Sequence, residues 1–410
     1  ARSKHKIPSF VDFFFKTDFI IFDIAKMEVN KDLIKFLWNM SDTTSNNDEY
    51  SDYPFNPDLL LDDLRSNLYR HKEPFNIVLM VVYAVAMLAG LVGNGFVILV
   101  VVRQRHMRTL TNVFFLNLTI GDLLVLIICI PITLGNYLYR DWIYGEIMCK
   151  VTPFLQGTAV SVSVFSMLAI SINRYFAIHI PLKAKLMFSR QNVVIIIVLI
   201  WIASFGAISP LLFVNNVTTY GVPGIFEARA CEEKWGTPQL KQIYSLVMLG
   251  ILFVSPLSGM ATMYSIISTT LWNADRQLYP NGTKTAKVQT DRVIKQRRKT
   301  VRTLISLVII FGVCWLPYYV VNIWLDFNIQ SPSANDVLNY VYPLVQLLAL
   351  SNSTVNPICY CFLTNGFRRA FINICCRKKR RTNHGTIVTV RYKCPLSDDS
   401  AFESVETVLS

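Results

Sequence analysis

The chain has 410 residues, of which 52% are hydrophobic, and a mean hydropathy of +0.39. This composition is more apolar than that of a soluble domain and predicts a membrane protein. The net charge of +13 does not indicate nucleic-acid binding, because the basic residues gather in the connections between apolar segments, as on the cytoplasmic side of membrane proteins. The nine cysteines are too scattered for a metal site or a disulfide-rich scaffold.

Residues 1–73 precede the first apolar segment, and we expect them to be extracellular and largely disordered. From Asp42 to Glu73 acidic residues outnumber basic ones and aromatic residues are few, which is typical of disorder. Asn39 begins a glycosylation sequon on this outer side.

Seven apolar segments are long enough to cross a bilayer as helices. They are Ile77–Val102, Leu110–Tyr139, Val151–Ile172, Val193–Val214, Ile243–Trp272, Leu304–Leu325 and Val337–Gly366. Lysine and arginine concentrate in the first, third and fifth connections and after the seventh segment, which places these parts inside the cell and the N-terminus outside. The sequence therefore predicts an all-α membrane protein, with a seven-transmembrane helix bundle over residues 74–364.

The fifth connection and the residues after the seventh segment are cytoplasmic parts that differ in composition. The connection from about Asn273 to Gln296 is polar and basic, and we expect a loop there. Residues 365–376 predict a short amphipathic helix on the inner membrane surface, with palmitoylation candidates at Cys375 and Cys376. Residues 377–410 form a cytoplasmic tail. Its end is acidic and rich in hydroxyl groups, and we expect this end to be disordered and phosphorylated.

Several residues within or beside the spans carry chemistry. Asp122 is a carboxylate near the middle of the membrane, which predicts either a functional acid or a protonated or hydrogen-bonded structural one. Pro317 removes a backbone hydrogen bond from the sixth segment and predicts a hinge. Cys149 and Cys231 both lie on the oxidising outer side and are a natural disulfide pair. The turn residues between Tyr220 and Phe226 predict a hairpin.

Taken together, a set of motifs that appear in order, one to a helix, resembles the rhodopsin-like class of G-protein-coupled receptors, over about Phe75 to Cys376. The set is Gly93-Asn94, Leu118 to Asp122, Cys149, Asn173-Arg174-Tyr175, Trp201, Pro256, Cys314-Trp315-Leu316-Pro317 and Asn356-Pro357-Ile358-Cys359-Tyr360.

The resemblance implies roles in activation. Arg174, Tyr264 and Tyr360 are expected to meet beneath a G-protein cavity when the sixth helix swings outward. The other residues that the resemblance assigns to activation and coupling are Asn173, Tyr175, Phe311, Pro317, Asn356 and Pro357. Family members commonly hold the arginine with acids at positions that here are Asn173 and Arg297, so we expect measurable signalling without ligand.

The resemblance also implies an allosteric sodium site, matched here by Asp122, Ser163, Asn352 and Ser353. Carboxylate, hydroxyl and amide oxygens suit a hard cation. The alternative is a water-filled polar network without an ion. We expect no other cofactor.

Two positions restrict the ligand within the family. Amine receptors carry an aspartate where this chain has Gln156, and opsins carry a lysine in the seventh helix, where this chain has none. Peptides remain, and the outer motifs look most like receptors for RFamide-type, orexin and neuropeptide Y related peptides. A receptor for a different peptide or hormone is the alternative.

The pocket residues favour a peptide that ends in arginine, an aromatic residue and an amide. Gln156 can receive a carboxamide. Asp326, four residues from Asn322, can take a guanidinium, although it could also be a solvated charge at the helix end. An aromatic side chain would be enclosed by Trp315, Tyr318 and Tyr319, with Gln346 as a polar wall.

The resemblance, together with this topology, also implies the partners. They are an extracellular peptide, a heterotrimeric G protein, membrane lipid, and a receptor kinase and arrestin at the tail, all at the plasma membrane. A transporter or channel is the main alternative of another class, but we find no repeat between the halves of the chain. An enzyme is not expected, because the five histidines are scattered through tails and loops.

Overall fold

The computed structural model describes residues 73–139, 141–222, 226–277, 284–363, 366–368, 370, 377–382, 388–393 and 402–406. The predicted glycosylation at Asn39 and palmitoylation at Cys375 and Cys376 lie outside these residues, as does segment 1–72. They stay predictions, and so does the division into 1–73, 74–364, 365–376 and 377–410.

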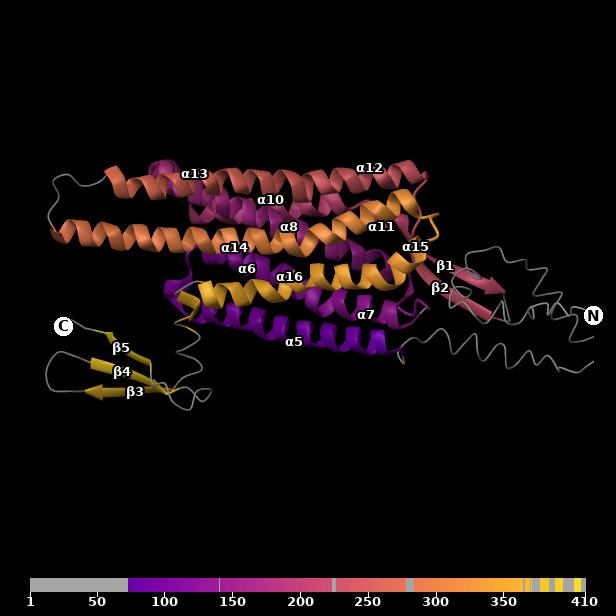
Figure 1. Ribbon diagram of the computed structural model, residues 1–410, viewed down its shortest axis with the longest axis horizontal. Coiled ribbons are helices and arrows are strands. Elements are labelled where there is room, and N and C mark those ends of the chain that lie inside the picture. Colours follow the sequence, from indigo (N-terminus) through magenta and orange to yellow (C-terminus); the bar gives the residue numbers. More distant parts are fainter. Residues whose placement is uncertain are drawn as a thin grey trace, which may run out of the picture. The chain divides into compact units, whose positions relative to one another are not determined.

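The apolar segments form long helices (Figure 1). In chain order these are α5 (Pro74–Arg103), α6 (Leu110–Leu124), α7 (Ile130–Leu138), α8 (Gly145–His179), α10 (Arg190–Ile208), α11 (Leu211–Val214), α12 (Pro238–Leu249), α13 (Ser255–Gln277), α14 (Lys284–Asn328), α15 (Ala334–Asp336) and α16 (Tyr342–Leu363). The inner connections add a 3-10 turn (Arg105–Met107) and α9 (Pro181–Met187).

Six helical stretches of the described part are long and apolar enough to cross a membrane. They are Pro74–Arg103, Leu110–Leu138, Gly145–His179, Arg190–Val214, Pro238–Asn273 and Ile294–Asn328. The seventh predicted segment is also helical, from α15 to α16. The predicted all-α membrane fold is confirmed.

Proline explains three interruptions in these helices. π-helical turns occupy Val125–Cys129, Gly250–Val254 and Val337–Val341. In each, the N–H group of the next residue, Ile130, Ser255 or Tyr342, donates to the carbonyl five residues earlier. The residue after that is a proline every time. Because proline has no N–H group and its ring crowds the carbonyl four residues earlier, the preceding turn widens.

The chain divides into two compact units. The first comprises Ala1–Val81, Pro131–Pro153 and Pro210–Lys234. Its described part contains an antiparallel hairpin of β1 (Asn215–Val222) and β2 (Phe226–Glu233), in which Val217 lies opposite Cys231. The predicted hairpin is confirmed.

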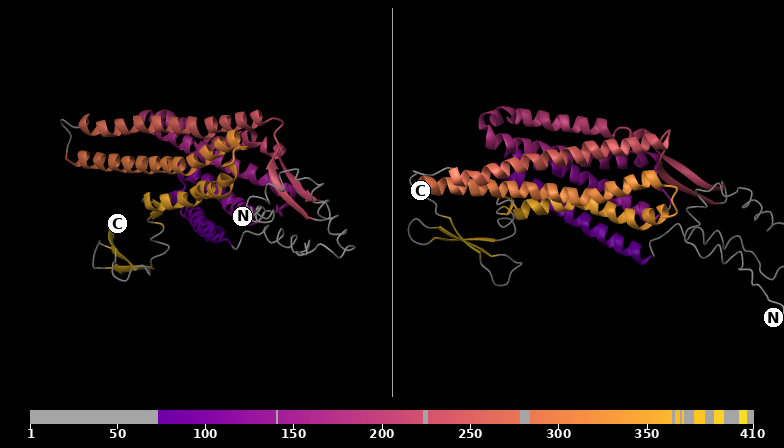
Figure 2. Two further views of the ribbon diagram at one scale, coloured as in Figure 1. Left: turned by 45° about the vertical axis from the view of Figure 1, so that its right-hand side comes forward. Right: turned by 45° about the horizontal axis from the view of Figure 1, so that its top comes forward.

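The second unit comprises Val82–Ile130, Phe154–Ser209 and Trp235–Ser410, and contains most of the helical length. Figures 1 and 2 show α14 lying between α13 and α16, and it packs against both. Helix α5 joins α16 through Asn94, whose Nδ2 donates to the carbonyl of Ser353 (2.9 Å). A Cβ atom on Gly93 would lie 2.8 Å from Pro357 Cγ, so glycine permits this close approach.

Two cytoplasmic expectations are wrong. The expected loop from Asn273 to Gln296 is mostly helical, because α13 continues to Gln277 and α14 begins at Lys284. Its lysine, arginine and glutamine residues are good helix formers, so polarity there indicates a helix that leaves the membrane. The acidic end of the tail, expected to be disordered, contains β5 (Phe402–Glu406), which pairs with β4 (Val388–Lys393) in an antiparallel sheet that β3 (Arg377–Thr382) completes.

Candidate functional site

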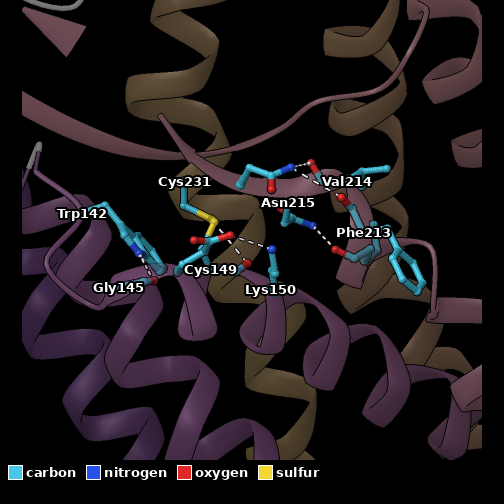
Figure 3. A network of polar contacts seen from close by, with 11 residues as sticks. Trp142, Gly145, Cys149, Lys150, Phe213, Val214, Asn215 and Cys231 are labelled. Carbon is cyan, nitrogen blue, oxygen red and sulfur yellow. Dashed lines mark hydrogen bonds and ion pairs between the residues drawn. A yellow bond between two sulfur atoms is a disulfide. The ribbon is translucent and has the colours of Figure 1, made fainter. Parts of the chain in front are cut away.

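The outer disulfide forms as predicted. Cys149, near the start of α8, is bonded to Cys231 of β2, with their Cα atoms 5.5 Å apart (Figure 3). Cys149 is fully buried. The bond closes a sequence separation of 82 residues and fixes the hairpin to the helix.

Two further contacts attach β2 to the segment before α8. The Arg229 carbonyl accepts from the Trp142 backbone N–H (2.7 Å), and the Arg229 N–H donates to Asp141 Oδ1 (2.7 Å). The Arg229 guanidinium also pairs with Asp141 at 3.4 Å. Trp142 Nε1 donates to the carbonyl of Gly145 (2.7 Å) (Figure 3), whose φ of +74° favours glycine. The first outer connection therefore positions the hairpin.

One acid and one tyrosine interact on the hairpin itself. The Tyr220 hydroxyl donates to Glu232. Burial, and then this carboxylate, raise the pKa of Tyr220 above its usual value, so the phenol stays protonated and the hydrogen bond holds at neutral pH.

The predicted ligand residues on α14 follow one face of the helix. Asp326 and Asn322 lie above Tyr319, Tyr318 and Trp315 at spacings of three and four residues. The Asn322 Nδ2 donates to the carbonyl of Tyr318 (2.8 Å), which leaves its second N–H and its amide oxygen as groups it can offer a ligand.

Asp326 is not a solvated charge at the helix end. Its side chain is 5% exposed, and its Oδ1 pairs with Lys241 Nζ of α12 at 3.1 Å. Its Oδ2 is buried and has no hydrogen-bond partner among the described residues. Gln242 Nε2 donates to the Asp326 backbone carbonyl (3.0 Å). The outer ends of α12 and α14 therefore meet at this carboxylate. Its Oδ2 is the oxygen that could accept a hydrogen bond from a ligand.

The aromatic residues form a continuous cluster beneath it. Trp315 contacts Tyr318 edge-on with ring centroids 5.5 Å apart, and it lies 6.3 Å from Phe311. The cluster extends to Tyr319 and to Phe253 of the fifth segment, whose rings are 5.4 Å apart. Trp315 Nε1 is buried without a hydrogen-bond partner among the described residues. The other two predicted ligand residues, Gln156 of α8 and Gln346 of α16, are also buried, at 9% and 8% exposure.

The candidate sodium residues are only partly brought together by direct contacts. Asp122 is 1% exposed, and its Oδ2 accepts from Asn356 Nδ2 (3.0 Å). Ser353 is hydrogen-bonded to the same carboxylate. Asn352 Oδ1 is buried without a hydrogen-bond partner in the described part of the chain, and Ser163 is buried at 4% exposure. These oxygen groups fit a hard cation.

Three of the predicted activation residues, Arg174, Tyr264 and Tyr360, each contact a different partner. Arg174 Nη2 donates to Thr111 Oγ1 of α6 (2.6 Å). Tyr264 Oη lies 2.7 Å from Ser171 Oγ, and Tyr360 stacks on Phe115 with centroids 4.3 Å apart. We call this the resting arrangement.

The two positions considered for an acidic partner of Arg174 are Asn173 and Arg297, and neither carries a carboxylate. Within the described ranges, the Arg174 guanidinium forms no ion pair with a carboxylate. Its Nε is buried without a hydrogen-bond partner there. A neutral hydroxyl therefore holds the arginine in the resting arrangement.

The basic inner part of α14 contacts α13. Arg298 Nη2 donates to the carbonyl of Leu271 (2.5 Å), and its guanidinium carbon lies 5.1 Å from the centre of the Trp272 ring. Arg302 lies 5.9 Å from the same ring. These cation–π contacts tie the inner ends of the fifth and sixth predicted spans together.

Sequence reasoning missed four of these residues, for separate reasons. Lys241 precedes the apolar run that begins at Ile243, although Thr237 and Pro238 are a helix-start signal that would have included it. Thr111, Asp141 and Arg229 are paired across long stretches of chain, and no local pattern indicates such pairs. Asn356 was assigned to activation, and its contact with Asp122 was not foreseen.

Comparison with known proteins gives a consistent family. The sequence model of the 7 transmembrane receptor (rhodopsin family) matches residues 93–360. A QRFP-like peptide receptor of Branchiostoma floridae is 35% identical over 309 residues, covering 74% of this chain and 79% of that protein. Neuropeptide FF receptor 2 of Mus musculus is 33% identical, with 77% of each chain covered.

A third relative is the pyroglutamylated RF-amide peptide receptor of Rattus norvegicus. It is 30% identical over 310 residues, covering 75% of this chain and 71% of that protein. The family model spans the positions of Asp122, Arg174, Trp315 and Asn356. The chain belongs to the rhodopsin family of seven-transmembrane receptors.

Proposed function

We propose that this protein is a plasma-membrane receptor for an extracellular peptide that ends in arginine, an aromatic residue and a C-terminal amide, and that it activates a heterotrimeric G protein. The observation that carries the peptide assignment is the Asp326 carboxylate. It is buried above an aromatic cluster, and its Oδ2 has no hydrogen-bond partner in the described part of the chain. The relatives, which include an RF-amide peptide receptor and a neuropeptide FF receptor, support this ligand class.

The chemistry of each group matches one part of such a peptide. A guanidinium presents a planar pair of donors to a carboxylate, which suits Asp326. An aromatic side chain packs favourably against Trp315 and Tyr318 in edge-on geometry. The amide side chain of Gln156 offers one donor group and one acceptor to a terminal carboxamide. Gln346 supplies a further polar group beside them.

The route from ligand to G protein follows the same helix. The ring contacts run from Tyr318 through Trp315 to Phe311, and Pro317 lies within this stretch of α14. A ligand that moves Trp315 therefore acts directly beside the proline, where the helix lacks a backbone hydrogen bond. In the signalling state we expect the inner half of α14 to move outward and Arg174 to give up its hydrogen bond to Thr111 of α6. A receptor kinase and arrestin would act on the tail.

Sodium is proposed as an allosteric ligand at Asp122, Ser163, Asn352 and Ser353. The support is chemical: one buried carboxylate, two hydroxyl groups and the unpartnered Asn352 Oδ1. Bound sodium would supply a positive charge that compensates Asp122 inside the membrane. The competing arrangement is a polar network filled by water, in which Asn356 and Ser353 hold the carboxylate.

The test uses an alanine-based peptide ending in Arg-Phe-amide and cells that express the full-length receptor. Calcium and cyclic-nucleotide responses are measured for this peptide, for its free acid and for a version with citrulline, which has the shape of arginine without its charge. The amide is expected to be active and the other two much weaker. Asp326→Ala is expected to weaken the amide by about 2 to 5 kcal/mol, as when one partner of a buried charge pair is removed.

Asp336→Ala is the matched control, because Asp336 is an exposed acid near the same outer end. Potency should not change in this variant. If the free acid or the citrulline peptide is as potent as the amide, or if Asp326→Ala leaves potency unchanged, the assigned ligand class is wrong.

A further inference from the structure

The carboxylate assigned to the ligand already holds a cation from the protein itself. Lys241 Nζ lies 3.1 Å from Asp326 Oδ1, and the two side chains differ in exposure, with 40% for Lys241 and 5% for Asp326. The acid is therefore fixed in the protein interior, whereas the lysine reaches it from the solvent side. A flexible lysine stem can withdraw into water without exposing apolar surface of the core.

The geometry of this pair is incomplete. One carboxylate oxygen takes the lysine, and the other is buried without a hydrogen-bond partner among the described residues. An ammonium group is a compact point charge, while a guanidinium presents two parallel N–H groups that fit both oxygens of a carboxylate. Exchange of Lys241 for a guanidinium would therefore satisfy an acceptor that the internal pair leaves unsatisfied.

The helix ends do not depend on Lys241 to stay together. Gln242 Nε2 donates to the Asp326 backbone carbonyl, so α12 and α14 keep a direct contact if the lysine leaves. The lysine can thus move without separating the two helices.

We propose that Lys241 is a displaceable counter-ion of Asp326, which the ligand's guanidinium replaces, and that this exchange sets the selectivity of the receptor for arginine over lysine. The inference rests on the proposed function. Without ligand, Lys241 neutralises a carboxylate that would be costly to leave buried and unpaired. A ligand lysine only repeats the contact that Lys241 already makes and gains little, whereas a ligand arginine adds the second hydrogen bond.

Two substitutions of Lys241 are expected to have opposite effects on one peptide. Lys241→Met keeps the length of the stem but removes the competing cation, so affinity for the peptide ending in Arg-Phe-amide should rise by about tenfold. The corresponding Lys-Phe-amide peptide should gain at least as much, which reduces the discrimination between the two. Lys241→Arg completes the internal pair with a guanidinium and should lower the affinity of the arginine peptide.

The measurement is competition binding on membranes with full-length receptor, normalised to surface expression. Lys234→Met serves as control, since Lys234 is an exposed lysine that precedes α12 in the chain, and its removal should change the affinity of neither peptide. If Asp326→Asn weakens the arginine peptide but Lys241→Met weakens it too or has no effect, Lys241 is not a competitor and the inference falls while the proposed function stands.

If Asp326→Asn has no effect on the arginine peptide, the proposed function and this inference fail together. Should Lys241→Met not reach the cell surface, Lys241→Arg still decides, because unchanged or raised affinity in that variant contradicts the exchange.

Discussion

Replacing Thr111 with valine is expected to raise signalling in the absence of ligand. Valine has nearly the shape of threonine, so the main change is the loss of the hydroxyl that accepts from Arg174 Nη2 at 2.6 Å. Among the described residues, no carboxylate forms an ion pair with Arg174 that could replace this hydrogen bond. The guanidinium would then lose the contact that holds it toward α6 in the resting arrangement.

The size of the effect follows from the charge of the donor. A hydrogen bond from a charged group contributes about 1.5 to 3 kcal/mol, which corresponds to roughly a ten- to hundredfold shift in the equilibrium. If about 1% of the unliganded receptor is in the signalling state, the loss of this bond would raise that fraction to roughly a tenth or more. Asn173→Asp should act in the opposite direction, because it places a carboxylate next to Arg174.

The assay is G-protein activation without ligand, measured over a range of receptor levels and expressed per receptor at the cell surface. Thr269→Val is the matched control, because the exposed Thr269 hydroxyl donates to the carbonyl of Ile266 in its own helix. Basal signalling should follow the order Asn173→Asp, wild type, Thr111→Val. Basal activity of Thr111→Val at or below that of the wild type would refute the role given to this hydrogen bond.

Two further outcomes concern the disulfide and the sodium site. Cys149→Ser or Cys231→Ser should reduce surface expression and ligand binding, because closing a separation of 82 residues constrains the unfolded chain by up to about 4 to 5 kcal/mol. Labelling of Cys149 by a thiol reagent on intact, unreduced cells would contradict the pairing. Asp122→Asn should abolish any difference in peptide affinity between sodium and choline buffers. A sodium effect that persists in this variant would place the ion elsewhere.

The long apolar segments allowed the sequence to predict the helices, but not where they end. Hydropathy detects the part of a helix that lies in the membrane, so Lys241 and the charged inner half of α14 fell outside the predicted spans. Capping residues mark the true starts: Thr237 accepts from the Leu240 N–H, and Ser189 accepts from that of Asn192. Such signals extend the helices by the turns that hydropathy misses.

The disulfide and the hairpin were predictable because each depends on one strong local or environmental rule. The pairs Arg174–Thr111 and Asp122–Asn356 were not, since they join residues separated by 63 and 234 positions. Their geometry depends on how the helices rotate about their own axes. The three π-helical turns were partly predictable, because each ends two residues before a proline that is visible in the sequence.

Nucleotide exchange with purified components shows whether a peptide makes this receptor activate a G protein. Receptor in lipid discs is combined with heterotrimeric G protein and the peptide ending in Arg-Phe-amide, and GTP-analogue binding is followed over time. The amide should accelerate exchange, and its free acid should do so far less. Arg174→Ala should abolish the acceleration. Exchange that the peptide does not change, or that Arg174→Ala leaves intact, would contradict the proposed function.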